Sequence, residues 1–223
     1  MKTLLIFTFF LISGLVGCFD VFGYSEGSVR MECKYQKNGN YSKFFCKKGT
    51  DGCINVQTQN NWVHKERLSL HDSPGALTLI FRNLSLQDSG SYRCGETGGW
   101  SHDVELKVKR DLCCSGPSAV TGFLGEILTI NCSSPEEFKT NTKHFYKEEC
   151  QFLTEIVSTT WSQRNKFSIS EDRSSKVVSV KISELREEDG GVYYCGVLIS
   201  GKSVSYYSLY TEMQLQVNGK FKF

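Results

Sequence analysis

The chain has 223 residues, and its 26 Lys and Arg against 24 Asp and Glu give a formal net charge of +2. So small a charge excludes a strongly basic nucleic-acid-binding protein, and we expect no nucleic-acid partner. Ten cysteines are more than a cytosolic chain of this size carries, and they predict disulfide bonds formed in an oxidising compartment.

Residues 1–18 are predicted to be a secretory signal peptide. A short basic start is followed by the apolar run from Leu4 to Val16 and then by small residues. This run is too short to span a bilayer comfortably. The stretch "LVGC" also matches a bacterial lipoprotein box, which is a weaker pattern. Because no second long apolar run follows, we expect no membrane anchor in this chain and an extracellular protein, secreted or held at the plasma membrane in a longer form.

The remaining chain is an internal repeat. "DSGSYRCG" (88–95) and "DGGVYYCG" (189–196) share the pattern Asp-x-Gly-x-Tyr-x-Cys-Gly, and each follows a run of alternating apolar residues. Upstream, "GSVRMEC" and "EILTINC" each place apolar residues four and two positions before the cysteine. These matches predict two similar units, residues 19–110 and 118–218, a linker at 111–117 and a C-terminal tail at 219–223.

Each unit is predicted to be an immunoglobulin-like β-sandwich of the variable type. Alternation with period two is typical of strands with one buried face, and no long helical period competes with it. The spacing from Cys33 to Cys94 nearly equals that from Cys132 to Cys195, which fits a disulfide between strands B and F in each unit. The middle of each unit is long enough for extra strands. The fold class is therefore all-β, with two tandem V-type sandwiches after the signal peptide.

Two ion pairs are expected to close the sandwiches. Arg67 opens a strand in the first unit and would face Asp88, four residues before the tyrosine of the repeated motif. Lys166 and Asp189 occupy the corresponding positions in the second unit. These pairs are structural, and each is expected to contribute about 1 kcal/mol where it is partly exposed.

The stretch "SKFFCKKGTDGC" carries Cys46 and Cys53 in a basic, Gly-containing turn. This cysteine pair has three interpretations: a metal knuckle, a redox pair or a structural disulfide. Zinc needs four ligands within reach and only one cysteine pair is local, while a redox pair would need CxxC. The residues therefore favour a disulfide, and we expect no metal and no cofactor.

These residues carry a resemblance. "FFCKKGTDGC" together with "DSGSYRCG" resembles the polymeric immunoglobulin receptor-like family and its leukocyte mono-immunoglobulin-like relatives, over residues 19–218. The resemblance implies that Cys46–Cys53 braces the C–C′ hairpin. It also implies an immune receptor ectodomain that binds immunoglobulin or an anionic phospholipid, with possible immune signalling. The second unit departs from the pattern, because Tyr146 replaces the first cysteine while Cys150 remains.

Three cysteines have no partner by this reasoning. Cys113 and Cys114 lie in the linker, and Cys150 is expected at the opposite end of the second sandwich. Since a disulfide needs Cα atoms within about 7 Å, these residues are predicted to be unpaired or to form a bridge to a partner chain.

Three Asn-x-Ser sequons predict N-glycosylation at Asn40, Asn83 and Asn131. No catalytic motif accompanies the four histidines, so the protein is not expected to be an enzyme. A homophilic adhesion protein is the alternative to a receptor.

Ligand contacts are expected from loops and from exposed basic or aromatic side chains. The first unit is the more basic, and the candidate residues there are Lys34, Lys37, Lys43, Lys47, Lys48 and Trp100. Trp100 either projects from the loop "GETGGWSHD" or folds back on the sheet. In the second unit the F–G loop, predicted as "GVLISGKSVSYYSLY", is longer and has a paratope-like composition, which makes Tyr206 and Tyr207 candidates.

Overall fold

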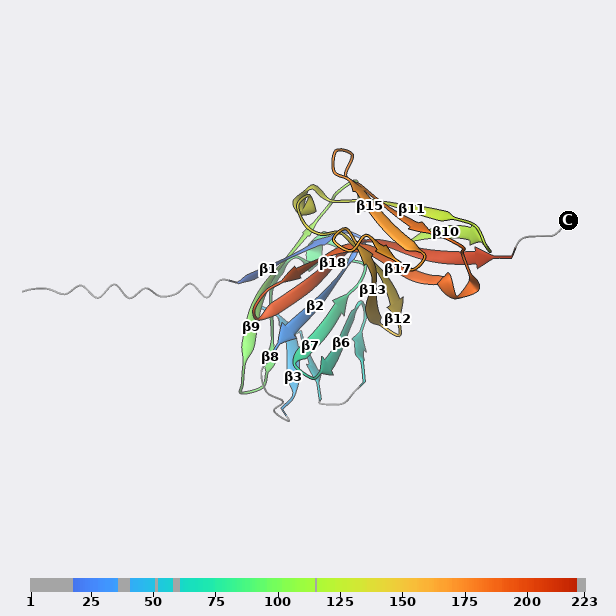
Figure 1. The fold of residues 1–223 in the computed structure, drawn as a ribbon. Helices are drawn as coiled ribbons and strands as arrows, with labels where there is room; N and C mark the ends of the chain where they lie inside the picture. The colour runs from blue at the N-terminus through green and yellow to red at the C-terminus, as the bar shows by residue number, and fades with distance from the viewer. Residues whose placement is uncertain (1–17, 36–40, 51, 58–60, 115, 220–223) are drawn as a thin grey trace, which may run out of the picture.

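The computed structural model describes residues 18–35, 41–50, 52–57, 61–114 and 116–219. The predicted signal peptide up to residue 17, Lys37 and Asn40 lie outside these ranges. The fold confirms the all-β prediction, with two V-type sandwiches in tandem (Figure 1). In the part of the chain described, no helix is long and apolar enough to cross a membrane.

The first domain has one five-stranded sheet and one four-stranded layer facing it. The five-stranded sheet runs in the order β1 (Phe19–Tyr24), β9 (Ser101–Lys109), β8 (Gly90–Glu96), β3 (Lys43–Lys47), β4 (Cys53–Val56). The facing layer runs β2 (Ser28–Lys34), β7 (Ala76–Phe81), β6 (Leu68–Ser73), β5 (Val63–Lys65).

The second domain repeats this arrangement. One layer runs β13 (Phe152–Ser158), β12 (His144–Glu149), β17 (Gly191–Ser200), β18 (Val204–Asn218), with β10 (Ser118–Phe123) parallel to the end of β18. The facing sheet runs β11 (Leu128–Ser133), β16 (Val177–Ile182), β15 (Phe167–Asp172), β14 (Gln163–Arg164). Three single-turn 3-10 helices complete the described elements: η1 (Leu86–Asp88), η2 (Glu136–Phe138) and η3 (Glu187–Asp189).

One strand belongs to both domains. The first residues of β18, Val204–Leu209, pair antiparallel with Cys33–Ser28 of β2, and its last residues pair with β10. Figure 1 shows β18 (orange-red) beside the blue β2 at its start. The two domains therefore share one continuous nine-stranded sheet, and the first domain receives an edge strand from the second.

Both cores are built around a disulfide and a stacked aromatic pair. Cys33–Cys94 and Cys132–Cys195 are bonded across their sandwiches with Cα separations of 6.5 and 6.4 Å. The ring of Phe45 stacks on Tyr92 at 5.1 Å between centroids, and Phe145 stacks on Tyr193 at 5.0 Å. These phenyl–phenol pairs fill the space that strand-C tryptophan occupies in antibody domains.

The repeated glycines are required by close packing. A Cβ built on Gly23 would lie 2.5 Å from Leu84 Cδ1, and one on Gly122 would lie 2.4 Å from Leu185 Cδ2. Real Cβ atoms do not approach so closely, so only glycine lets each strand pack directly against its core leucine.

The turn before each F strand is closed by the aspartate of the repeat. The hydroxyl of Tyr92 donates to the carbonyl oxygen of Asp88 (2.6 Å), as the hydroxyl of Tyr193 does to that of Asp189 (2.7 Å). Asp88 also accepts two hydrogen bonds of 2.8 Å from the guanidinium of Arg67. Lys166 forms an ion pair with Asp189 in the second domain.

We expect Arg67→Met to destabilise the protein by about 1 kcal/mol at neutral pH, because the pair is partly exposed. Burial opposes ionisation of Asp88, but the hydrogen bond from Arg67 and the Ser85 amide outweigh it and lower its pKa. A carboxyl whose pKa is lower in the folded state contributes stability above its unfolded pKa, near 4, and loses it as the pH falls through the folded pKa.

The measurement is urea denaturation of the wild type and the variant from neutral pH to about pH 3, the lower end of the range in which paired carboxyls titrate. The difference in unfolding free energy should shrink below about pH 4. Arg164→Met, at an exposed guanidinium over Trp161, is the control and should have little effect. A difference that stays constant across this range would contradict the assignment.

Candidate ligand-binding face

Three rings stack at the loop end of the first domain. Tyr35 follows β2, and its ring stacks on Trp100 with centroids 5.2 Å apart and planes inclined by 20°. Trp100 precedes β9 and packs in turn against His102, 5.2 Å away. All three side chains are half-buried. Trp100 has therefore folded back on the sheet, and together the three residues form what we call the ring stack.

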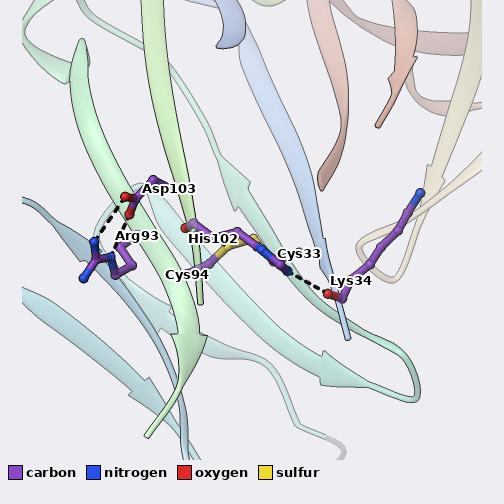
Figure 2. Close-up of a disulfide and its surroundings, with 6 residues drawn as sticks. All are labelled: Cys33, Lys34, Arg93, Cys94, His102 and Asp103. Atoms are coloured by element: carbon purple, nitrogen blue, oxygen red, sulfur yellow. Dashed lines mark hydrogen bonds and ion pairs between the residues drawn. A yellow bond between two sulfur atoms is a disulfide. The ribbon is translucent and has the colours of Figure 1, made fainter. Parts of the chain in front are cut away.

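His102 joins the ring stack to the region of the core disulfide. Figure 2 shows His102 beside the Cys33–Cys94 bond, reaching across from β9 to the end of β2. Nε2 of His102 lies 3.0 Å from the carbonyl oxygen of Lys34. Because a carbonyl oxygen only accepts, this nitrogen carries the hydrogen. The bond fixes the orientation of the imidazole and joins the two sheets next to the disulfide.

Tyr35 is held from its other side. Its hydroxyl oxygen lies 2.7 Å from both Asp72 Oδ1 and the carbonyl oxygen of Ser73. Burial, followed by the hydrogen bond to Asp72, raises the pKa of Tyr35, so its hydroxyl stays protonated. The phenol is thus fixed at both ring and hydroxyl, and the ring stack is a preorganised surface.

Lys43 was predicted to contact ligand, and this is wrong. Its side chain is buried, because Lys43 shares the inward-facing positions of β3 with Phe45. Its ammonium donates to Glu96 Oε1 at 2.8 Å and to the carbonyl oxygen of Tyr41 at 3.2 Å, and lies 4.9 Å from the ring centroid of Tyr35. Lys43 and Glu96 therefore support the ring stack from beneath.

The tip of the β17–β18 hairpin lies beside the ring stack. The backbone amide of Lys34 donates to the carbonyl oxygen of Ser203 (2.8 Å), and its ammonium donates to that of Gly201 (3.0 Å). Lys202, between these two residues, is exposed. The second domain therefore adds a cationic residue to the loop end of the first domain.

The other predicted lysines do not gather on this face. Lys47 donates to the carbonyl oxygen of Gln87 (2.9 Å), in the turn before β8, and Lys48 pairs with Asp103 at 2.7 Å. The hydrogen bonds from Arg93, with Lys48, lower the pKa of Asp103 to about 2. Alternation along β3 and the turn that follows it separates these lysines, so no single basic patch forms among the described residues.

Tyr206 and Tyr207 were also predicted to contact ligand. The structure contradicts this for Tyr206, which is buried, while Tyr207 is half-buried and its role stays a prediction. Tyr206 is buried in the core of the first domain and meets Phe19 edge-on at 6.0 Å. Tyr207 points to the opposite face, where it packs against Tyr146 and lies under the guanidinium of Arg30. Both rings lie within the contact between the domains because β18 pairs with β2.

Further contacts fix the two domains to each other. The guanidinium of Arg82, just after β7, donates to Glu148 Oε1 (2.5 Å) and to the hydroxyl of Tyr194 (3.0 Å). Phe138 packs edge-on against Tyr24 at 5.9 Å and also contacts Tyr210. The position of the hairpin tip beside the ring stack is thus set by the whole interface.

The remaining cysteines lie away from the ring stack. Cys46 and Cys53 are bonded to each other and join β3 to β4. Cys113 and Cys114 were predicted to be unpaired or intermolecular; the structure instead joins these neighbours, whose Cα atoms are 3.8 Å apart, to each other. Cys150 is free and exposed, in the two-residue turn between β12 and β13 where both residues have positive φ.

Two of the sequons lie within the described residues. Asn83 is exposed in the turn after β7, and Asn131 is exposed on β11, where its side-chain oxygen accepts a hydrogen bond from Ser179 (2.8 Å). Both side chains have access to solvent, and their glycosylation stays a prediction.

The sequence prediction missed Tyr35, His102 and Glu96. A signal for Tyr35 was present, because it lies two residues after Cys33 at a predicted strand end, as the predicted Trp100 lies near Cys94. Nothing in the local pattern pointed to Glu96 as the partner of Lys43. Among the residues described, no group of three or more His, Cys, Asp or Glu is arranged to hold a metal ion. The face offers aromatic and hydrogen-bonding contacts.

Paired sandwiches, B–F disulfides, tyrosine corners and a loop-end aromatic surface define an immunoglobulin-superfamily ectodomain. The family model "Immunoglobulin V-set domain" matches residues 20–109 and 115–218. The chain belongs to the V-set family, and it is a receptor-like ectodomain related to the polymeric immunoglobulin receptor and to the CMRF35-like molecules.

Two relatives match this chain to different extents. The polymeric immunoglobulin receptor of Rattus norvegicus is 33% identical over 191 residues, which are 78% of this chain and 25% of that protein. CMRF35-like molecule 9 of Mus musculus is 35% identical over 89 residues, 36% of this chain and 27% of that protein. The chain thus spans about a quarter of the length of these relatives. The solved teleost fish polymeric Ig receptor ectodomain matches with a TM-score of 0.38 and 20% identity, covering 92% of this chain and 98% of that one.

Proposed function

We propose that this protein is an extracellular immune receptor ectodomain, secreted or held at the plasma membrane in a longer form, whose ligand is an immunoglobulin. The ring stack and the adjoining tip of the β17–β18 hairpin make up the contact surface. The role is binding, not catalysis. Signalling would pass through a partner or a membrane segment in a longer form.

The observation that carries the proposal is the ring stack itself. Tyr and Trp that are rigidly held give large contact area at little cost in conformational entropy, and such residues dominate binding energy at protein interfaces. Here Trp100 is stacked between Tyr35 and His102, and Tyr35 is fixed at its hydroxyl. The family relation supports an immunoglobulin ligand, because relatives of this chain are named polymeric immunoglobulin receptors.

The charges favour a protein ligand over an anionic phospholipid. Lys34 donates to the hairpin tip, Lys43 is buried beneath the ring stack, and Lys48 pairs with Asp103. A membrane of anionic lipids is attracted by a cluster of unpaired basic side chains. Lys43 and Lys48 are paired with the carboxylates of Glu96 and Asp103, whereas Lys34 and the exposed Lys202 keep their charge beside the ring stack. Two such cations are fewer than the about four to eight basic residues typical of segments that bind anionic membranes.

The test is the binding of the mature chain to immobilised polymeric immunoglobulin. We expect Trp100→Ala to weaken binding at least about tenfold, the loss of a central aromatic contact. Trp161→Ala is the matched control, because Trp161 is exposed in the second domain, and it should leave the affinity unchanged. Thermal unfolding of both variants checks that the first domain remains folded.

Three results would overturn the proposal. Equal affinities of the wild type and Trp100→Ala would remove the ring stack from the contact. Binding to phosphatidylserine vesicles without binding to immunoglobulin would select the phospholipid ligand. Self-association of the chain without binding to either would select homophilic adhesion.

A further inference from the structure

The second domain has an open sheet edge where the first domain has a covered one. β2 and β11 are equivalent strands of the repeat. β2 is paired on both sides, with β7 and with β18. Within the described residues, β11 pairs only with β16, so its other side presents unpaired backbone N–H and C=O groups. Such an edge is a template for another strand.

The residues leading into the two strands differ in the same way. Tyr24 and Ser28 in the first domain are each 2% exposed, and Tyr24 packs on Phe138 of the second domain. Their counterparts in the repeat, Phe123 and Ile127, are 40% and 61% exposed. The surface that the first domain covers with its neighbour therefore remains open on the second domain, with apolar side chains beside it.

The open edge also lacks the usual protection against pairing. Exposed edge strands in monomeric proteins commonly carry lysine, other charges or proline. The covered strand β2 (SVRMECK) carries Arg30, Glu32 and Lys34, whereas the open strand β11 (LTINCS) carries no charge and no proline. Its exposed side chains are Thr129, Asn131 and Ser133.

We propose that β11 pairs antiparallel with β11 of a second copy of this chain. Two identical edges related by a twofold axis satisfy each other's backbone groups, and such an interface closes at the dimer. Any register that places the two cores on one face of the joined sheet places the polar side chains of Thr129, Asn131 and Ser133 of both copies on its other face. The hairpin that covers the equivalent edge is already bound to β2, so it cannot also cover β11.

The interface is small. Six residues span about 20 Å of strand, so the dimer rests on backbone pairing and on Phe123 and Ile127 at its ends. Asn131 is also a predicted glycosylation site, and a glycan there would lie over the pairing strand, so the proposed dimer is one of chains that carry no glycan on Asn131. The test therefore uses the variant N40Q/N83Q/N131Q.

Sedimentation equilibrium of this variant from about 10 µM to about 500 µM, the range of weak association, is expected to show a mass rising toward twice that of the monomer. Hydrogen exchange in residues 128–133 should slow as the concentration rises. The matched variant N40Q/N83Q/N131K places two like charges close to the twofold axis and should weaken dimerisation at least about tenfold.

Ser170→Lys in the glutamine background is the control. Ser170 is exposed on the same face as Asn131, but on β15, which lies between β16 and β14 in its sheet. It should dimerise as the background does. A chain that remains monomeric throughout, a dimer whose exchange at 128–133 does not change, or an N131K variant that dimerises as strongly as N131Q would each overturn the proposal.

Discussion

Tyr206→Ala is expected to destabilise the first domain by about 3 kcal/mol, although Tyr206 lies in a strand of the second. The ring is buried in the first domain's core against Phe19, and the strand around it pairs with β2. Truncation leaves a cavity at the contact between the domains, since the neighbouring side chains relax only in part.

Hydrogen exchange under mild denaturant resolves which domain is affected. In Tyr206→Ala, exchange of β2 and β7 should accelerate more than exchange of β15 and β16. Tyr207→Ala is the matched control, because this ring faces away from the first domain's core and packs against Tyr146. Its ring also lies under Arg30 of β2, so exchange of β2 should accelerate less than in Tyr206→Ala, and exchange of β7 should not change. If β2 and β7 exchange in Tyr206→Ala as they do in the wild type, the shared strand does not stabilise the first domain.

The second large effect is expected at the buried ion pair. Lys43→Met would leave the carboxylate of Glu96, 8% exposed, without its ammonium, and we expect a loss of about 3–5 kcal/mol. Because replacing both members of a buried pair by apolar residues is far less costly than removing one, Lys43→Met with Glu96→Leu should recover most of this loss.

The measurement is a double-mutant cycle of unfolding free energies in urea. Lys48→Met serves as the control, because Lys48 pairs with Asp103 near the surface and its loss should cost less than about 1 kcal/mol. A Lys43→Met variant as stable as the wild type, or a double variant no more stable than Lys43→Met, would contradict the assigned energetics of the buried pair.

The fold could be predicted because the same strand pattern occurs in both copies of the repeat. Single strands are predicted well from local sequence. The alternation before Cys33 and Cys132 and the motif that ends at Cys94 and Cys195 are both properties of single strands. The tyrosine of each motif similarly indicated a corner that both domains form.

The candidate site was less predictable, since its residues depend on contacts between distant segments. Lys43 is a charged residue that a composition-based argument places at the surface, and only the position of Glu96 on the neighbouring strand allows its burial. Tyr206 was assigned to a loop. A local signal did exist, because Val204 and Tyr206 alternate with polar Ser205 after a Ser-Gly-Lys-Ser turn, which is a hairpin pattern.

The shared strand imposes an order on biosynthesis. Because the chain is synthesised from its N-terminus, every core strand of the first domain has been made once Lys109 is reached. The segment of β18 that pairs with β2 and completes this domain's sheet ends only at Leu209. During the translation of the intervening residues, the first domain has an unpaired edge at β2. We therefore expect folding intermediates that retain chaperones at this edge until the second domain is almost fully synthesised.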